Sequence, residues 1–200
     1  MNKLFAALTK PAKLIFIIGG FVYALWFGIQ TGLSINGGFV NVFSNIIVLF
    51  VGVGLLVIPP LFLLIKKEET AKLIFVFLLG FWVLTAPREF FALADGFADA
   101  QEFYPVFVAI FFLLVGLGIV AILVLVVLQL LFGMKFLRPI INLIALIVVG
   151  LSILTAILFI ILCAINKVDW SFYVRYALMD LTVLPVTVGA GCLYFFSAEK

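Results

Sequence analysis

Apolar residues form six long runs along the chain, and the short segments between them carry most of the charged residues. A helix crosses a hydrocarbon core about 30 Å thick with about 20 residues. The transmembrane helices are therefore expected over six ranges: 14–33, 40–65, 71–87, 104–132, 137–165 and 170–196. The ten-residue alternation of membrane β-strands is absent from these runs. The pattern predicts an all-α, polytopic membrane helix bundle, with residues 1–200 forming one transmembrane domain.

Basic residues are unevenly distributed between alternate connecting segments. One set of segments contains Lys3, Lys10, Lys13, Lys66, Lys67, Lys72, Lys135, Arg138 and Lys200. The other set contains only Arg88, Lys167 and Arg175, together with Glu89, Asp95, Asp99, Glu102 and Asp169. Because cytoplasmic loops carry the excess of lysine and arginine, both termini are expected in the cytoplasm, which agrees with six spans. With no N-glycosylation sequon present, we expect an integral protein of a prokaryotic plasma membrane.

The composition excludes several classes of protein. Sixty-eight per cent of the 200 residues are hydrophobic and 10% are charged, which is too apolar for a soluble domain of this size or for a disordered chain. The chain has no histidine and two cysteines, so histidine-based triads, histidine–metal sites and CxxC redox motifs are excluded. We expect no cofactor, no metal, no nucleic-acid partner and no enzymatic activity.

Small residues and prolines indicate where the helices pack or end. Gly116 and Gly118 lie within one expected span, where they allow a neighbouring helix to approach closely. Pro139 is expected to terminate or kink regular helix near the cytoplasmic end of its span. Cys163 is expected near the outer face of the membrane and Cys192 near the inner face, so we expect no disulfide between them.

Residues 88–103 follow a proline and form an expected interfacial segment on the outer side. Arg88, Asp95, Asp99 and Glu102 fall within about 60° of one another on a helical wheel, opposite several phenylalanines and alanines. This pattern predicts a short amphipathic helix lying on the membrane surface. The simpler interpretation is that its charges are only solvated. The alternative is that Asp95, Asp99 and Glu102 form a surface for a cation or a partner protein.

Asp180 is the polar residue that most needs an explanation. It follows Trp170 by ten residues, which places it about 15 Å inside the expected outer interface, near the midplane. A carboxylate at that depth costs a few kcal/mol, so it should face the interior of the bundle. Tyr176 and Thr187 share its helix face. Asp180 either fixes the packing register of the helix or takes part in function, and the sequence does not decide between the two.

Four further residues complete a hypothetical site around Asp180. Arg88 is its expected cationic partner, and Asn45 opens the second span on the same side. Asp180, Arg88, Tyr176, Thr187 and Asn45 would then line an outward-facing polar site for a small solute or a proton. The alternative is that the polar residues near the helix ends are ordinary interfacial residues.

Two function classes follow from the sequence. Ranges 104–132 and 137–165 contain almost no polar residue over their central turns, so they face lipid or the helices of other membrane proteins. We therefore expect an accessory or structural subunit of a larger membrane complex. The alternative is a small transporter or channel component that uses the site around Asp180. A third class, an intramembrane enzyme, is disfavoured because a single buried acid is not enough for catalysis.

Overall fold

The computed structural model describes residues 2–33, 54, 56–80, 103–166, 179 and 182–197. The described part is helical and contains no strand, which confirms the all-α class. Its elements are α1 (Asn2–Leu33), a helical hairpin with helices at 56–64 and 68–80, α4 (Phe103–Phe132), the 3₁₀ turn η2 (Lys135–Leu137), α5 (Arg138–Asn166) and α7 (Leu184–Ser197).

Three of the described helices are long and apolar enough to cross a membrane. Their candidate spans are Ala7–Trp26, Leu113–Phe132 and Lys135–Leu158, and Leu184–Phe196 is a shorter apolar helix. Three spans are fewer than the six expected. The other expected ranges, 40–65, 71–87 and 170–196, each include residues outside the described part, so the count of six stays a prediction.

The expected and observed helix boundaries agree best where the sequence changes abruptly from charged to apolar residues. The expected ranges 104–132 and 137–165 differ from α4 and α5 by no more than one residue at each end. Pro139 is the second residue of α5, where its missing amide proton costs no helical hydrogen bond. α1 begins at Asn2, twelve residues ahead of the expected membrane span 14–33. Alanine, leucine and lysine in this stretch favour helix, and Pro11 lies inside it.

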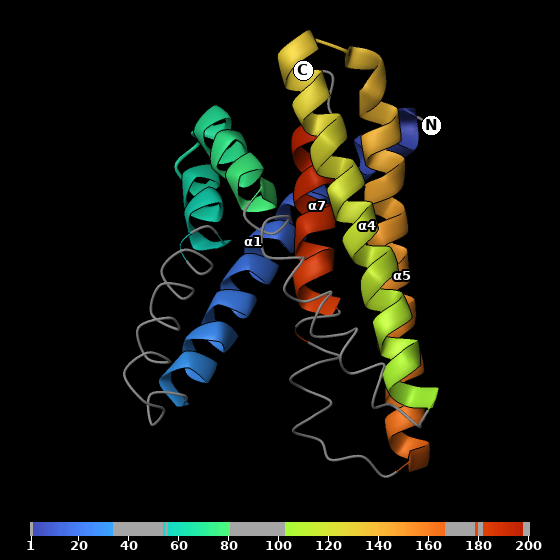
Figure 1. Ribbon diagram of the computed structural model, residues 1–200. Coiled ribbons are helices and arrows are strands. Elements are labelled where there is room, and N and C mark those ends of the chain that lie inside the picture. Colours follow the sequence, from blue (N-terminus) through green and yellow to red (C-terminus); the bar gives the residue numbers. More distant parts are fainter. Residues whose placement is uncertain are drawn as a thin grey trace.

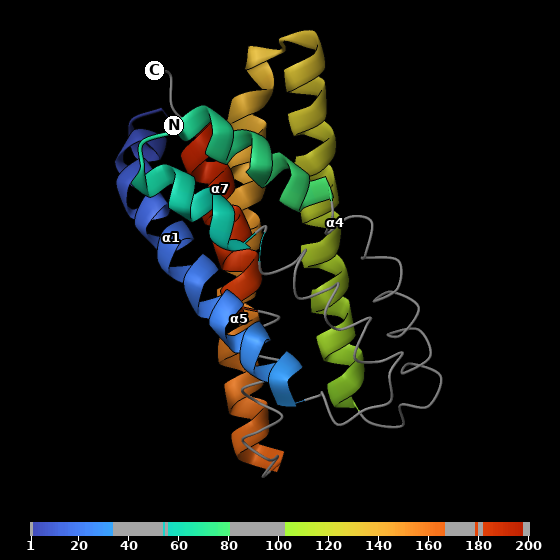
Figure 2. The ribbon, with the colours of Figure 1, turned by 90° about the vertical axis from the view of Figure 1, so that its left-hand side faces the viewer.

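The helices form a bundle with α7 near its centre (Figures 1 and 2). α4 and α5 run antiparallel to each other, and their axes are nearly aligned with that of α7 (Figure 1). α1 crosses the bundle at an incline (Figure 1). The N-terminus, the turn at 65–67, η2 and the C-terminal end of α7 lie at one end of the bundle (Figure 1). We call this the lysine-rich end, because its described residues include Lys10, Lys13, Lys66, Lys67, Lys72 and Lys135.

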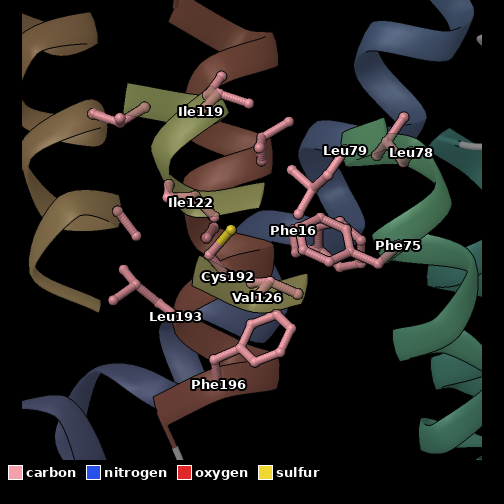
Figure 3. Close-up of a cluster of buried hydrophobic side chains, with 14 of the residues drawn as sticks. Phe16, Phe75, Leu78, Leu79, Ile119, Ile122, Val126, Cys192, Leu193 and Phe196 are labelled. Atoms are coloured by element: carbon pink, nitrogen blue, oxygen red, sulfur yellow. The ribbon is translucent and has the colours of Figure 1, made fainter. Parts of the chain in front are cut away.

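Glycines let α7 approach its neighbours closely. A Cβ atom on Gly189 would lie 2.5 Å from Val149 Cγ2 of α5, and one on Gly191 would lie 2.5 Å from the Phe75 ring. Phe75, Phe16 and Cys192 are completely buried and belong to one apolar cluster (Figure 3). In lipid, helices associate mainly through such close packing, because the hydrophobic effect does not distinguish lipid tails from leucine.

Glycines also allow close approach between the other helices. A Cβ atom on Gly20 would lie 2.7 Å from the carbonyl oxygen of Leu56, so α1 packs directly against the backbone of the hairpin at 56–80. A Cβ atom on Gly118 would lie 2.6 Å from Val148 Cγ2, which confirms the close helix contact predicted for this glycine. The glycines thus determine how near α1, α4 and α5 lie to their neighbours.

Gly191→Ala should lower stability, because its new methyl group overlaps the rigid Phe75 ring. Overpacking of this kind costs about 1–3 kcal/mol. Gly150→Ala is the matched control, since no heavy atom lies within 4 Å of a Cβ at that position of α5. The measurement is the temperature at which each purified variant loses its monodisperse peak in detergent. Equal temperatures for Gly191→Ala and Gly150→Ala would contradict the glycine packing.

Candidate functional site

Thr187 is the one predicted site residue that lies in the described part. Its side chain is buried, and its hydroxyl donates a hydrogen bond to the carbonyl oxygen of Val183, at 2.6 Å. The hydroxyl faces Gly19 of α1, where a Cβ atom would collide with it. The observed role of Thr187 is therefore to pack α7 against α1, with its hydrogen bond satisfied within its own helix.

The remaining predicted site residues lie outside the described residues. They are Asp180, Arg88, Tyr176 and Asn45 of the proposed polar site, and Asp95, Asp99 and Glu102 of the outer segment. Their grouping stays a prediction. The described residues nearest to Asp180 in sequence are Met179 and Thr182, both partly buried.

The backbone that leads into α7 departs from regular α-helix. Thr182 and Val183 lie in a wide π-helical turn immediately before Leu184, the first residue of α7. Pro185 has no amide proton, so it cannot donate the hydrogen bond that an α-helix would make at this point. Wide turns of this kind are rare and occur frequently at functional sites. This turn lies beside the position of Asp180 in the sequence.

A polar contact at the lysine-rich end ties the end of α7 to the hairpin at 56–80. The Tyr194 hydroxyl donates a hydrogen bond to Glu68 Oε1, at 2.8 Å. Lys13 Nζ of α1 lies 5.4 Å from the centroid of the Tyr194 ring, and Lys72 Nζ lies 5.3 Å from that of Phe196. Both distances are typical of cation–π contacts. We call Lys13, Glu68, Lys72, Tyr194 and Phe196 the interface cluster.

Three phenylalanine rings pack against one another next to the interface cluster. The Phe16 ring meets Phe75 edge-on at 5.3 Å and Phe195 at 5.7 Å, and the Phe75 and Phe195 centroids are 5.2 Å apart. Tyr194 in turn stacks edge-on against Phe195 at 5.1 Å. Such pairs add about 0.5–1.5 kcal/mol to the burial of the rings. The interface cluster and these rings together connect α1, the hairpin at 56–80 and α7 where the three meet.

The α4–α5 pair holds buried polar side chains. Ser152 and Thr155 donate hydrogen bonds to the carbonyl oxygens of Val148 and Leu151 in their own helix. The side-chain oxygens of Gln129 and Asn142 are buried and have no hydrogen-bond partner among the residues that the structure describes. Both amides lie toward the lysine-rich end, outside the central turns that the sequence indicated to be nearly free of polar residues.

The sequence reasoning missed the Tyr194–Glu68 contact and the two buried amides. Tyr194 and Glu68 are 126 positions apart, so no local pattern links them. One feature of the sequence could have indicated the contact. Tyr194 lies near the end of the last apolar run, and both it and the charged segment 66–69 belong to the predicted cytoplasmic interface.

The described residues place limits on the chemistry of the bundle. Within them, no group of three or more histidine, cysteine, aspartate or glutamate side chains is placed to hold a metal ion. No protein-family model, no curated protein and no solved structure significantly matches this chain. The contacts among the described residues pack the helices together and close the bundle at the lysine-rich end.

Tyr194→Phe should remove the hydrogen bond to Glu68 while it keeps the aromatic stacking. A hydrogen bond to a charged group contributes about 1.5–3 kcal/mol when buried, and less at this partly buried contact. The expected result is a modest fall in the temperature of unfolding in detergent. Glu69→Ala, at an exposed neighbouring position, should leave that temperature unchanged.

A double variant checks that Tyr194 and Glu68 act as a pair. Adding Tyr194→Phe to Glu68→Ala should cost little more than Glu68→Ala alone, because the shared hydrogen bond is already lost. Strictly additive losses would mean that the two side chains do not interact.

Proposed function

We propose that the protein is a non-catalytic integral membrane protein that serves as an accessory or structural subunit of a larger membrane complex. The observation that supports this proposal is the outer face of the α4–α5 pair. Among the side chains of α4 and α5 that the structure describes, the large exposed ones are apolar, and they include Leu113, Leu117, Val124, Leu143, Ile147, Ile153, Leu154, Ile157 and Ile161. The polar side chains Ser152 and Thr155 of α5 are buried and bonded within their helix. Such a face suits neighbouring helices or lipid and offers nothing for a reaction.

The proposal includes a topology of six spans with both termini in the cytoplasm of a prokaryotic cell. It is supported by the lysine-rich end, where the N-terminus, both short turns and the end of α7 come together (Figure 1). In this topology residues 88–103 lie on the outer surface, and Asp95, Asp99 and Glu102 are the candidate surface for a partner or a cation.

Co-purification tests the subunit proposal. The full chain, carrying an affinity tag, is extracted from its native membrane in a mild detergent and its complexes are separated by size. We expect other membrane proteins to co-migrate with it in fixed stoichiometry. Recovery of a stable, isolated monomer from fully extracted membranes would overturn the proposal.

A second proposal is that the protein is a small transporter or channel component. The wide turn at Thr182 and Val183 before Pro185 favours it, because interrupted helices near the midplane line the binding sites of many transporters. In this proposal Asp180, Arg88, Tyr176, Thr187 and Asn45 form the site for a small solute or a proton. The packing of Thr187 against Gly19 would then hold α7 in position beside that site.

Asp180→Asn distinguishes the two proposals. If the transport proposal holds, the variant should insert and fold normally but lose most of its flux or solute binding, because the charge at the midplane is gone. Flux is measured in proteoliposomes, with Thr70→Asn at an exposed position as the control. Unchanged flux in Asp180→Asn would remove Asp180 from the site, and a parent chain with no flux above empty liposomes would remove the transport proposal and leave the subunit proposal in place.

A further inference from the structure

Tyr23 of α1 is a buried phenol on the side of the helix that faces α7. Its side chain is 9% exposed and belongs to the main apolar cluster. Phe16 and Gly19 lie seven and four residues before it, so the three residues share one face of α1. Phe16 and Gly19 both contact α7 directly. Tyr23 therefore lies against α7 as well, one helical turn beyond Gly19.

The register between α1 and α7 places Tyr23 beside the wide turn at Thr182 and Val183. Three contacts fix this register, and they join Lys13 to Tyr194, Phe16 to Gly191 and Gly19 to Thr187. Each step of three residues along α1 is matched by a step of three or four residues back along α7, as expected for antiparallel helices. One further turn of each helix brings Tyr23 level with Val183 and Leu184.

Pro185 leaves a backbone oxygen of the wide turn without its usual donor. The proline nitrogen carries no proton, so one carbonyl group of the preceding turn cannot receive the hydrogen bond that a helix would supply. Carbonyl oxygens point toward the C-terminal end of a helix, which for α7 is the lysine-rich end (Figure 1). The free oxygen therefore points from the wide turn toward the level of Tyr23. In a membrane bundle such an oxygen needs a donor from a neighbouring group.

Tyr23 is the donor that the fold offers to this oxygen. A buried tyrosine hydroxyl normally has a hydrogen-bond partner. The hydroxyl of Thr187 is already used, because it donates to the carbonyl oxygen of Val183. Thr182, which is partly buried, offers its side chain as a competing acceptor. The backbone oxygen is favoured over Thr182, because a hydroxyl can rotate to another partner whereas an unsatisfied carbonyl in an apolar surrounding keeps its full cost.

We propose that Tyr23 acts as a latch on the wide turn, with its phenolic hydroxyl donating a hydrogen bond to the backbone oxygen that Pro185 leaves free. The bond joins α1 to the start of α7 and stabilises the interrupted backbone in one conformation. A wide turn contains one residue more than an α-helical turn, so it rotates the residues before it by about 100° relative to an uninterrupted helix. The latch thus sets the direction of the chain that enters α7, and it depends on neither proposed function.

A double-mutant cycle on the purified full chain tests the latch. Tyr23→Phe keeps the ring and removes the hydroxyl, and it should lower the unfolding temperature in detergent by about 2–4 °C, the effect of one buried hydrogen bond in a chain of this size. Pro185→Ala restores the amide proton, so Tyr23→Phe should shift the temperature by less than about 1 °C in that background. Equal shifts in the two backgrounds would overturn the latch.

Tyr194→Phe is the matched control, since it removes a tyrosine hydroxyl at the other end of α7. Its effect should be the same with and without Pro185→Ala, because distant sites act independently. If Pro185→Ala reduces the effect of Tyr194→Phe as well, the coupling is not specific to Tyr23 and the latch fails. The latch also fails if Tyr23→Phe is coupled to Thr182→Val instead, because the hydroxyl then bonds to the threonine side chain.

A donor-replacement series keeps Pro185 in place, so it decides the question even if Pro185→Ala does not fold. para-Aminophenylalanine at position 23 presents an N–H donor where tyrosine has its hydroxyl, whereas para-fluorophenylalanine presents none. We expect the amino variant to unfold within about 1 °C of the parent chain, and the fluoro variant to lose as much as Tyr23→Phe. If the amino and fluoro variants unfold at the same temperature, position 23 does not act as a donor and the latch is overturned.

Discussion

Close approach between helices is the constraint on which this bundle depends. Inside a membrane the helices gain little from being apolar, since lipid is apolar as well, and they must gain from contact instead. Gly189 and Gly191 bring α7 against α5 and the Phe75 ring, and Gly19 makes room for Thr187. Larger residues at these three positions would push α7 away from neighbours on two sides. The position of every group on α7, including the turn that leads to Asp180, follows from this packing.

Polar groups in the described part are arranged by depth. At the lysine-rich end, Tyr194 and Glu68 bond directly, with lysines over the neighbouring rings. Deeper in the bundle, Ser152, Thr155 and Thr187 each donate a hydrogen bond to the carbonyl oxygen four residues earlier in the chain. This division matches the cost of polar groups in hydrocarbon, where a hydroxyl without a partner is expensive. It also explains how α5 combines buried polar side chains with an apolar outer face.

The sequence predicted the parts of this fold that composition controls. The α4 and α5 boundaries follow from uncharged runs that end at a glycine or a basic residue, and the turn at 65–67 follows from its lysines. α1 extends ahead of the expected span because the lysine-bearing residues before the apolar run are also good helix formers. The Tyr194–Glu68 contact and the fit of Gly191 to Phe75 could not be predicted, because they depend on how distant helices meet. Of the proposed polar site, Thr187 was placed on α7 as expected, but its hydroxyl serves packing.

The contact between α1 and α7 has a consequence for biosynthesis. α1 is made first among the described helices and α7 last. The Phe16 and Phe75 rings therefore stay uncovered by α7 until the chain up to α7 has been translated. The α4–α5 hairpin, joined by a short turn, needs no such delay and can assemble on its own. The bundle core is therefore completed late, and before that moment the half-built chain offers bare aromatic surface to insertion machinery and to chaperones within the membrane.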